Sequence, residues 1–160
     1  MNLAQLFKEK DFTDSGILRY YNDLDTISLI LDYTGYVTES IFSGRKKNLS
    51  FDRELWLFKF TTISDYKYKE GSNVSFNGFE RDFSLKFYNV IIDSLSLKHN
   101  EDYYKMSIQL GVFGSLSFFF QDYYYECRQI KGIRKEGDDY LYQDINNQEV
   151  MYFSGFYEWK

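Results

Sequence analysis

The sequence predicts a mainly β protein: an antiparallel β-sandwich or strongly curled sheet with a short N-terminal helix. Three observations favour this class. Aromatic residues make up 21% of the chain, with 16 Tyr and 16 Phe, and such side chains suit pleated, half-buried surfaces. Apolar and polar residues alternate over several short segments. Proline is absent and Ala4 is the only alanine, whereas helical proteins use alanine freely.

The length and composition fit one globular domain. A chain of 160 residues can bury a single substantial core. It is 44% hydrophobic and 27% charged, as folded chains are. We expect a single domain over residues 1–160, with residues 131–160 as a candidate C-terminal hairpin extension.

The N-terminus predicts a short helix. Leu3, Leu6 and Phe7 have the i, i+3, i+4 spacing of an amphipathic helix over residues 2–9. A cluster of turn-forming residues at 13–16 ends this segment.

A β-hairpin follows the helix. Residues 17–21 and 26–33 predict two strands, and Asn22-Asp23 opens the tight turn between them. Strict alternation is typical of a half-buried strand. The alternating apolar residues of the second strand are Ile27, Leu29, Leu31 and Tyr33.

The middle of the chain contains a candidate central strand. Residues 34–53 are irregular and predict a long loop, whereas residues 54–63 predict a strand that residues 64–69 continue or turn. Residues 71–77 are polar and loop-like. Both faces of the 54–63 strand are apolar, which indicates burial on two sides. One face carries Trp56, Phe58 and Phe60, and the other carries Leu55 and Leu57.

Residues 83–87 and 90–97 predict further strands, and residues 102–130 predict a long hairpin. In that hairpin, residues 104–110 alternate, Gly111 to Gly114 supports the reversal, and residues 116–120 alternate on the return. Residues 123–130 are expected to extend the return strand beyond a bend or bulge near Gln121-Asp122.

The C-terminal segment from Lys131 onward differs from the preceding hairpin in its many charged residues. The charged segment that begins at Lys131 predicts a surface connection, and residues 140–142 and 150–157 predict a last hairpin around Asn146-Asn147.

The net charge, the length of the apolar segments and the number of cysteines limit the classes of function and the compartment that we expect. The net charge of -5 argues against a nucleic-acid binder and suits a partner with a basic surface. No apolar segment is long enough to span a membrane or to form a secretory signal, so we expect a cytoplasmic protein. A single cysteine agrees with a reducing compartment.

Motifs for catalysis and cofactors are scarce, and we predict no catalytic residue, cofactor or metal. His99 is expected to be exposed in a turn, and Cys127 is expected to be a buried, inert thiol. One Cys and one His do not make the usual zinc site within one chain. A Mg²⁺ or Ca²⁺ site made of Asp138, Asp139 and Asp144 stays open, although their spacing matches no calcium loop.

Aromatic residues allow two interpretations. Most of them are expected to fill the core of the sandwich. Exposed on a sheet, they could instead stack sugars or bases. The candidates for that role are Tyr66, Tyr68, Tyr103, Tyr123, Tyr125, Tyr152 and Trp159.

Two segments carry a family resemblance. The N-terminal series runs Leu3-Ala4-Gln5-Leu6-Phe7, then Phe12-Thr13-Asp14-Ser15, then a strand from Ile17, and the later segment covers residues 57–66. This arrangement, over about the first 70 residues, resembles small bacterial β proteins of the YxiG-like group, some of them assigned as immunity proteins of polymorphic toxin systems. Thr13 replaces the group's usual His, so no role of that imidazole carries over.

The resemblance implies a non-enzymatic cytoplasmic binding protein, an immunity protein that neutralises a toxin by occlusion. Carboxylates of the tail would pair with the toxin's basic rim while tyrosines anchor the contact. The predicted contact residues are Glu136, Asp138, Asp139, Tyr140, Tyr142 and Asp144. The alternative is a ligand-binding β module for carbohydrate or another small molecule.

Overall fold

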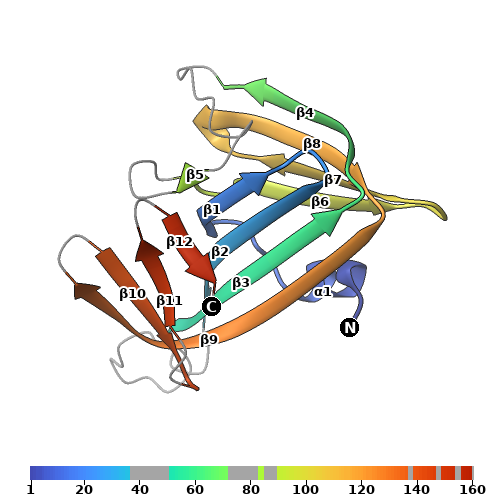
Figure 1. The fold of residues 1–160 in the computed structure, drawn as a ribbon. Coiled ribbons are helices and arrows are strands. Elements are labelled where there is room, and N and C mark those ends of the chain that lie inside the picture. The colour runs from blue at the N-terminus through green and yellow to red at the C-terminus, as the bar shows by residue number, and fades with distance from the viewer. Residues whose placement is uncertain are drawn as a thin grey trace, which may run out of the picture.

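The chain folds into two antiparallel sheets and one short helix (Figure 1). The computed structural model describes residues 1–36, 51–71, 83–84, 90–136, 139–146, 149–153 and 156–159. The mainly β class, with a strongly curled sheet and a short N-terminal helix, is confirmed.

The large sheet has eight strands in the order β12-β11-β10-β9-β3-β2-β1-β5, and the small sheet has four in the order β4-β8-β7-β6. The elements of the large sheet are β1 (Gly16–Asn22), β2 (Thr26–Tyr36), β3 (Phe51–Thr61), β5 (Phe83–Ser84), β9 (Asp122–Glu136), β10 (Asp139–Asp144), β11 (Glu149–Phe153) and β12 (Phe156–Trp159). The remaining elements are α1 (Leu3–Glu9), β4 (Ser64–Glu70), β6 (Ser94–His99), β7 (Tyr104–Gln109), the 3₁₀ turn Gly111–Phe113 and β8 (Gly114–Phe120).

The large sheet curls until its two ends approach each other. β12, at one edge, contacts β1 and β5 at the other (Figure 1). The sheet therefore has an outer face, which packs against α1 and the small sheet, and an inner, concave face.

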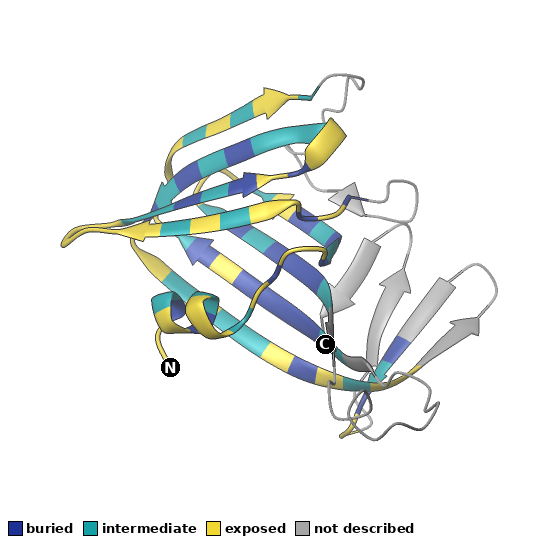
Figure 2. Cartoon of the chain, turned by 180° about the vertical axis from the view of Figure 1, so that it is seen from behind, coloured by how far each residue is buried: buried dark blue, intermediate teal, exposed yellow. Residues whose placement is uncertain are grey.

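The predicted helix is confirmed, and Asn2 starts it. Its side-chain Oδ1 accepts a hydrogen bond from the Gln5 N–H at 2.8 Å, which satisfies one of the unpaired donors of the first turn. Leu3 and Leu6 are buried, and the Phe7 ring stacks on Phe58 at 5.7 Å. Figure 2 shows α1 in front of the large sheet when the molecule is seen from behind.

Side chains alternate between the two faces of β1, β2 and β3. Leu29 pairs with Phe58 on the outer face, and the next pair, Ile30 and Leu57, lies on the inner face. The main core lies between the outer face, α1 and the small sheet. It is rich in aromatic rings, among them Phe12, Tyr20, Trp56, Phe58, Phe60, Phe118 and Phe120.

A second, smaller core lies inside the curl. It joins Leu18, Ile30, Leu55 and Leu57 to Tyr142, which reaches it from β10. The predicted burial of β3 on both sides is thus confirmed, because its two faces serve two different cores.

The predicted 34–53 loop is too long at both ends. β2 continues to Tyr36 and β3 starts at Phe51, since the two strands stay in antiparallel register over their whole length. Residues 37–50 and 71–77, apart from Gly71, lie outside the described residues. After β3 the chain turns at Thr62 and Ile63, and residues 64–70 form β4 in the other sheet.

The predicted 102–130 hairpin is confirmed for β7 and β8. The bend at Gln121 is also present, but there the chain leaves the small sheet, and β9 pairs with β3 of the large one. Of the predicted 83–87 strand, only β5 is described, and the 90–97 strand begins at Ser94. Val90 and Ile92, which the prediction included in this strand, precede β6 and are buried in the main core.

The predicted surface connection from Lys131 is wrong. β9 continues to Glu136 because its second half finds a partner in β10, which pairs with it from Ile130 to Glu136. The last hairpin is confirmed between β10 and β11, but residues 150–157 divide into β11 and β12, which pair with each other.

Candidate functional site

The six predicted partner-contact residues fall on β9, β10 and the connection between them. Glu136, Asp139 and Tyr140 lie in strands, and the structure does not describe their side chains. Asp138 lies outside the described residues.

Tyr142 and Asp144 are interior residues, so the expectation that they lie on a contact surface is wrong. Tyr142 is 6% exposed and Asp144 is 2% exposed. The Tyr142 hydroxyl lies 3.5 Å from Asp32 Oδ2, and its ring packs in the second core. The side chains turn inward because β10 pairs with β9 and closes over the inner face.

Four of the aromatic candidates help to fill the main core, as the interpretation favouring core packing expects. Tyr66, Tyr68, Tyr123 and Tyr125 are partly buried against it. Tyr103 is 40% exposed and packs edge-on against Phe119 at the tip of the β6–β7 hairpin. Tyr152 and Trp159 lie in β11 and β12, and their side chains are not described.

The two residues considered for nucleophilic chemistry lie in different sheets. His99 is exposed, as predicted, and ends β6 with its ring stacked on Tyr104 at 4.1 Å. Cys127 is exposed, and not buried as expected; it lies opposite Trp56 in the half of β9 that pairs with β3, before β10 joins β9 at Ile130. The pKa of its thiol is raised to about 12, mainly by partial desolvation and next by the negative charge of Glu54. The thiol is therefore protonated and unreactive at neutral pH.

Within the described ranges, no cluster of three or more His, Cys, Asp or Glu residues could hold a metal ion. In the same part of the chain, every helix is too short or too polar to cross a membrane.

The surface that stands out is the end of the molecule where the chain crosses between the sheets. We call it the corner end and define it as the β1–β2 turn (23–26), the β3–β4 corner (62–65) and the β8–β9 corner (121–122). Backbone hydrogen bonds join the three segments: Ile63 N–H donates to Asp25 O at 3.4 Å, and Gln121 N–H donates to Thr61 O at 3.3 Å. Turns distant in sequence thus form one continuous surface.

Three residues of the corner end have left-handed backbone conformations although none is glycine. The φ angles are 80° at Leu24, 56° at Thr62 and 50° at Asp65. This conformation is costly for residues with a Cβ, above all for leucine and a β-branched threonine. Strain of this kind gathers at functional sites more often than elsewhere.

Leu24 projects from this end into solvent. It is 81% exposed, more than any other large hydrophobic residue for which the structure gives burial. Its turn is held by polar side chains: Asn22 Oδ1 accepts from Leu24 N–H at 2.9 Å, and Asp23 Oδ1 accepts from Thr26 N–H at 2.7 Å. The leucine is therefore presented on an ordered turn.

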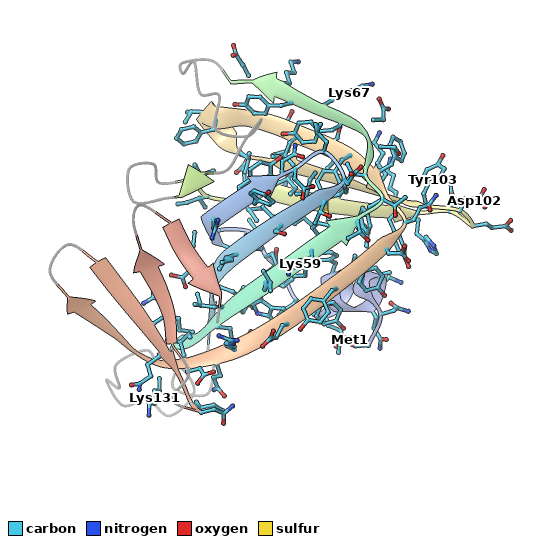
Figure 3. The ribbon with its side chains drawn as sticks, viewed as in Figure 1. Met1, Lys59, Lys67, Asp102, Tyr103 and Lys131 are labelled. Atoms are coloured by element: carbon cyan, nitrogen blue, oxygen red, sulfur yellow. The ribbon has the colours of Figure 1, made fainter. Side chains whose placement is uncertain are left out.

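Carboxylates flank Leu24 within its turn, and others lie elsewhere at the corner end. Asp23, Asp25, Asp65 and Asp122 are exposed at the corner end, and Lys67 lies 3.7 Å from Asp65. Beyond them, the tip of the β6–β7 hairpin adds Glu101 and Asp102; Figure 3 labels Asp102 and Tyr103 on this projecting tip. The surface is apolar at one point and acidic around it.

Sequence reasoning identified the β1–β2 turn but not this surface. The Asn22-Asp23-Leu24-Asp25 series predicts a turn. It carries no signal that Ile63 of the β3–β4 corner bonds to Asp25 of this turn, because that depends on how the two sheets join.

No family model, no curated protein and no solved structure matches this chain.

Proposed function

We propose that the protein is a non-enzymatic binding protein that uses the corner end to hold a partner protein with a basic surface. Its most specific form is that of an immunity protein that covers the active-site rim of a bacterial toxin in the cytoplasm. The observation that supports it is Leu24, exposed and held in a strained conformation between the exposed carboxylates of Asp23 and Asp25.

The charges would act first. The protein carries a net charge of -5, and the carboxylates of the corner end would attract a cationic surface and orient it during encounter. Exposed ion pairs add little affinity on their own, so this step sets the rate and the orientation more than the strength of binding.

Leu24 would supply the affinity. Burying a leucine side chain that the free protein leaves in solvent contributes about 2 kcal/mol. Because the turn around Leu24 is already ordered by Asn22 and Asp23, little conformational entropy is lost on binding.

The proposal shifts the contact surface away from the C-terminal strands. Tyr142 and Asp144 are interior and are not part of it. Glu136, Asp138, Asp139 and Tyr140 remain expectations from the sequence.

The test is co-expression with the toxin encoded by a neighbouring gene. We expect the wild-type protein to prevent killing. The variant Leu24→Gly, which suits the turn's backbone, is expected to lose protection and to bind at least about tenfold more weakly. The pair Asp25→Asn with Asp122→Asn is expected to slow association, most strongly at low ionic strength, with a smaller effect on affinity.

A matched pair controls for the loss of two charges. Glu70 and Asp93 are exposed at the opposite end of the small sheet, and Glu70→Gln with Asp93→Asn should protect like the wild type. Unchanged killing in the presence of the wild-type protein would exclude toxin neutralisation. Equal protection by all variants would exclude the corner end as the contact surface.

A further inference from the structure

The face of the small sheet that is turned away from the main core is cationic, although the protein is acidic. Ile108 and Leu116 form a cross-strand pair in the main core, so the residues before and after them in β7 and β8 point to the opposite face. In the view of Figure 2 the small sheet lies in front of the large sheet. We call this surface the lysine face and define it by three rows that cross the strands.

The rows follow the register of the small sheet. The first row is Ser94–Gln109–Ser115–Lys69, the second is Ser96–Ser107–Ser117–Lys67, and the third contains Lys98, Lys105 and Phe119. No residue of the three rows is acidic, in a chain of net charge -5. Along the strands, Asp93 and Glu70 lie just beyond the first row. The lysine face therefore differs in sign from the protein as a whole.

Lys98 and Lys105 stand directly opposite each other on β6 and β7. Two like charges in a cross-strand pair repel, so this pair lowers the stability of the free protein. Lysine on an edge strand prevents pairing with another chain, which accounts for Lys98 on β6 but not for Lys105 on the inner strand β7. The Lys105 Nζ lies over the Phe119 ring at 5.4 Å and keeps its positive charge there. An anionic group bound between the two ammonium groups would relieve the repulsion.

Lys67 and Lys69 form a second cationic group at the other edge of the sheet, on β4, where Figure 3 labels Lys67. They are two residues apart, so their side chains leave the same face of the strand about 7 Å from each other. Lys67 lies 3.7 Å from Asp65, but both side chains are more than half exposed, so solvent weakens this pair. Three strand spacings separate the two groups of lysines, a distance of about 14 Å.

Hydroxyl groups occupy the space between the lysines. Ser96, Ser107 and Ser117 stand side by side across three strands. A hydroxyl both donates and accepts hydrogen bonds, as the hydroxyls of a sugar do. Phe119 is the one aromatic residue of the three rows, and its ring lies under Lys105 and against the edge of Tyr103. The face therefore suits a hydroxylated anion better than it suits stacked bases or an apolar membrane interior.

We propose that the lysine face binds an anionic polysaccharide, a sugar chain that carries sulfate, phosphate or carboxylate groups. The chain crosses the strands. Its anionic groups pair with Lys98 and Lys105 at one edge and with the lysines of β4 at the other, and its hydroxyls bond to the serines between them. Exposed ion pairs are weak one by one, so the affinity comes from several together and falls as salt rises. This site does not depend on the partner surface at the corner end.

The experiment is an NMR titration of the ¹⁵N-labelled full chain with dextran sulfate at low and at high salt. The amide signals of β4, β6, β7 and β8 should shift at low salt, and the shifts should shrink at high salt. Competition against labelled dextran sulfate then compares ligand classes at equal concentration of charge. Poly-glutamate, oligothymidylate and vesicles of phosphatidylserine with phosphatidylcholine should each displace it less than unlabelled dextran sulfate does, and neutral dextran should not displace it.

The test variant is Lys98→Gln with Lys105→Gln, which should bind dextran sulfate about tenfold more weakly. It should unfold at the same or a higher urea concentration than the wild type, because it removes a like-charge pair. The control, Lys8→Gln with Lys59→Gln, removes two exposed lysines outside the small sheet and should bind like the wild type.

The proposal is overturned if the signals of the small sheet do not shift, or if the test variant binds as well as the control. A test variant less stable than the wild type would also overturn it, since the lysine pair would then support the fold. Better displacement by poly-glutamate, by oligothymidylate or by the vesicles would replace the polysaccharide with an acidic protein segment, a nucleic acid or a membrane.

Discussion

The hydroxyl of Tyr20 donates a hydrogen bond to the hydroxyl of Tyr66 at 2.8 Å, and this bond joins the two sheets. Tyr20 is fully buried in the main core, whereas Tyr66 is partly exposed on β4. Burial, together with the neighbouring Tyr66, raises the pKa of Tyr20 far above its ordinary value of 10.0.

This contact predicts a loss of stability in alkali. Below about pH 10, Tyr20 is neutral in both the folded and the unfolded chain, so its titration has no effect. Above that pH the unfolded chain releases the proton while the folded protein keeps it, and the free energy of unfolding falls by up to about 1.4 kcal/mol per pH unit.

Urea unfolding between about pH 9 and about pH 11 measures this slope. Tyr20→Phe should lower stability by about 1 kcal/mol at neutral pH and should flatten the alkaline decline. The exposed Tyr103→Phe should leave both unchanged. A decline of the same steepness in Tyr20→Phe would contradict the assignment.

Glu54 connects α1 to the sheet and should matter more than its partner Lys10. Its Oε2 lies 2.6 Å from Lys10 Nζ and accepts a hydrogen bond from Trp56 Nε1 at 2.8 Å. Glu54→Ala deprives both donors of their acceptor and should cost about 1–3 kcal/mol. Lys10→Met keeps an apolar stem over Tyr33 and Trp56, so it should cost about 1 kcal/mol or less. Urea unfolding of the two variants gives the comparison, and the reverse order would refute it.

Cys127 should react slowly although it is exposed. With a thiol pKa of about 12, the thiolate fraction near neutral pH is far below that of an ordinary cysteine. Alkylation by iodoacetamide near pH 8 should therefore be on the order of a hundredfold slower, or more, in the folded protein than in urea. Glu54→Gln should speed it, because the charge of Glu54 contributes to the raised pKa. Equal rates in folded and unfolded protein would show that the thiol is not perturbed.

Gly114 is required where the end of β4 meets the turn between β7 and β8. Its φ is 100°, and a Cβ there would lie 1.9 Å from Lys69 O. Gly114→Ala should therefore cost at least about 2 kcal/mol. Gly16→Ala is the control, since a Cβ at Gly16 meets nothing within 4 Å. Thermal unfolding of the two variants separates close packing from a general effect of replacing glycine.

Local patterns were sufficient for the parts of the fold that local contacts determine. The spacing of Leu3, Leu6 and Phe7 predicted α1, and the alternation of Ile27, Leu29 and Leu31 predicted the outer face of β2. A strand with one buried face shows its register in the sequence, because a shift by one residue would expose every apolar side chain.

Features that depend on long-range pairing were not accessible in this way. Tyr142 and Asp144 were predicted to be surface residues because their segment is charged. The pairing of β10 with β9 instead places them inside the curl. Cys127 was predicted to be buried, yet it is exposed in the half of β9 that pairs with β3. The corner end joins three turns through the connection of two sheets, which no single segment encodes.

The strain at the corner end yields the last prediction. At Leu24, with φ at 80°, glycine removes about 1–2 kcal/mol of steric cost and adds about 0.5–1 kcal/mol of unfolded-state entropy. Leu24→Gly should therefore be as stable as the wild type or up to about 1.5 kcal/mol more stable. Leu24→Val, which is β-branched, should be less stable. Urea unfolding measures both. A marked destabilisation by Leu24→Gly would mean that the leucine supports the fold, and unchanged stability would mean that the relief of strain and the added unfolded-state entropy cancel. Higher stability would mean that the strained, exposed side chain is kept at a cost to the free protein, as residues selected for binding are.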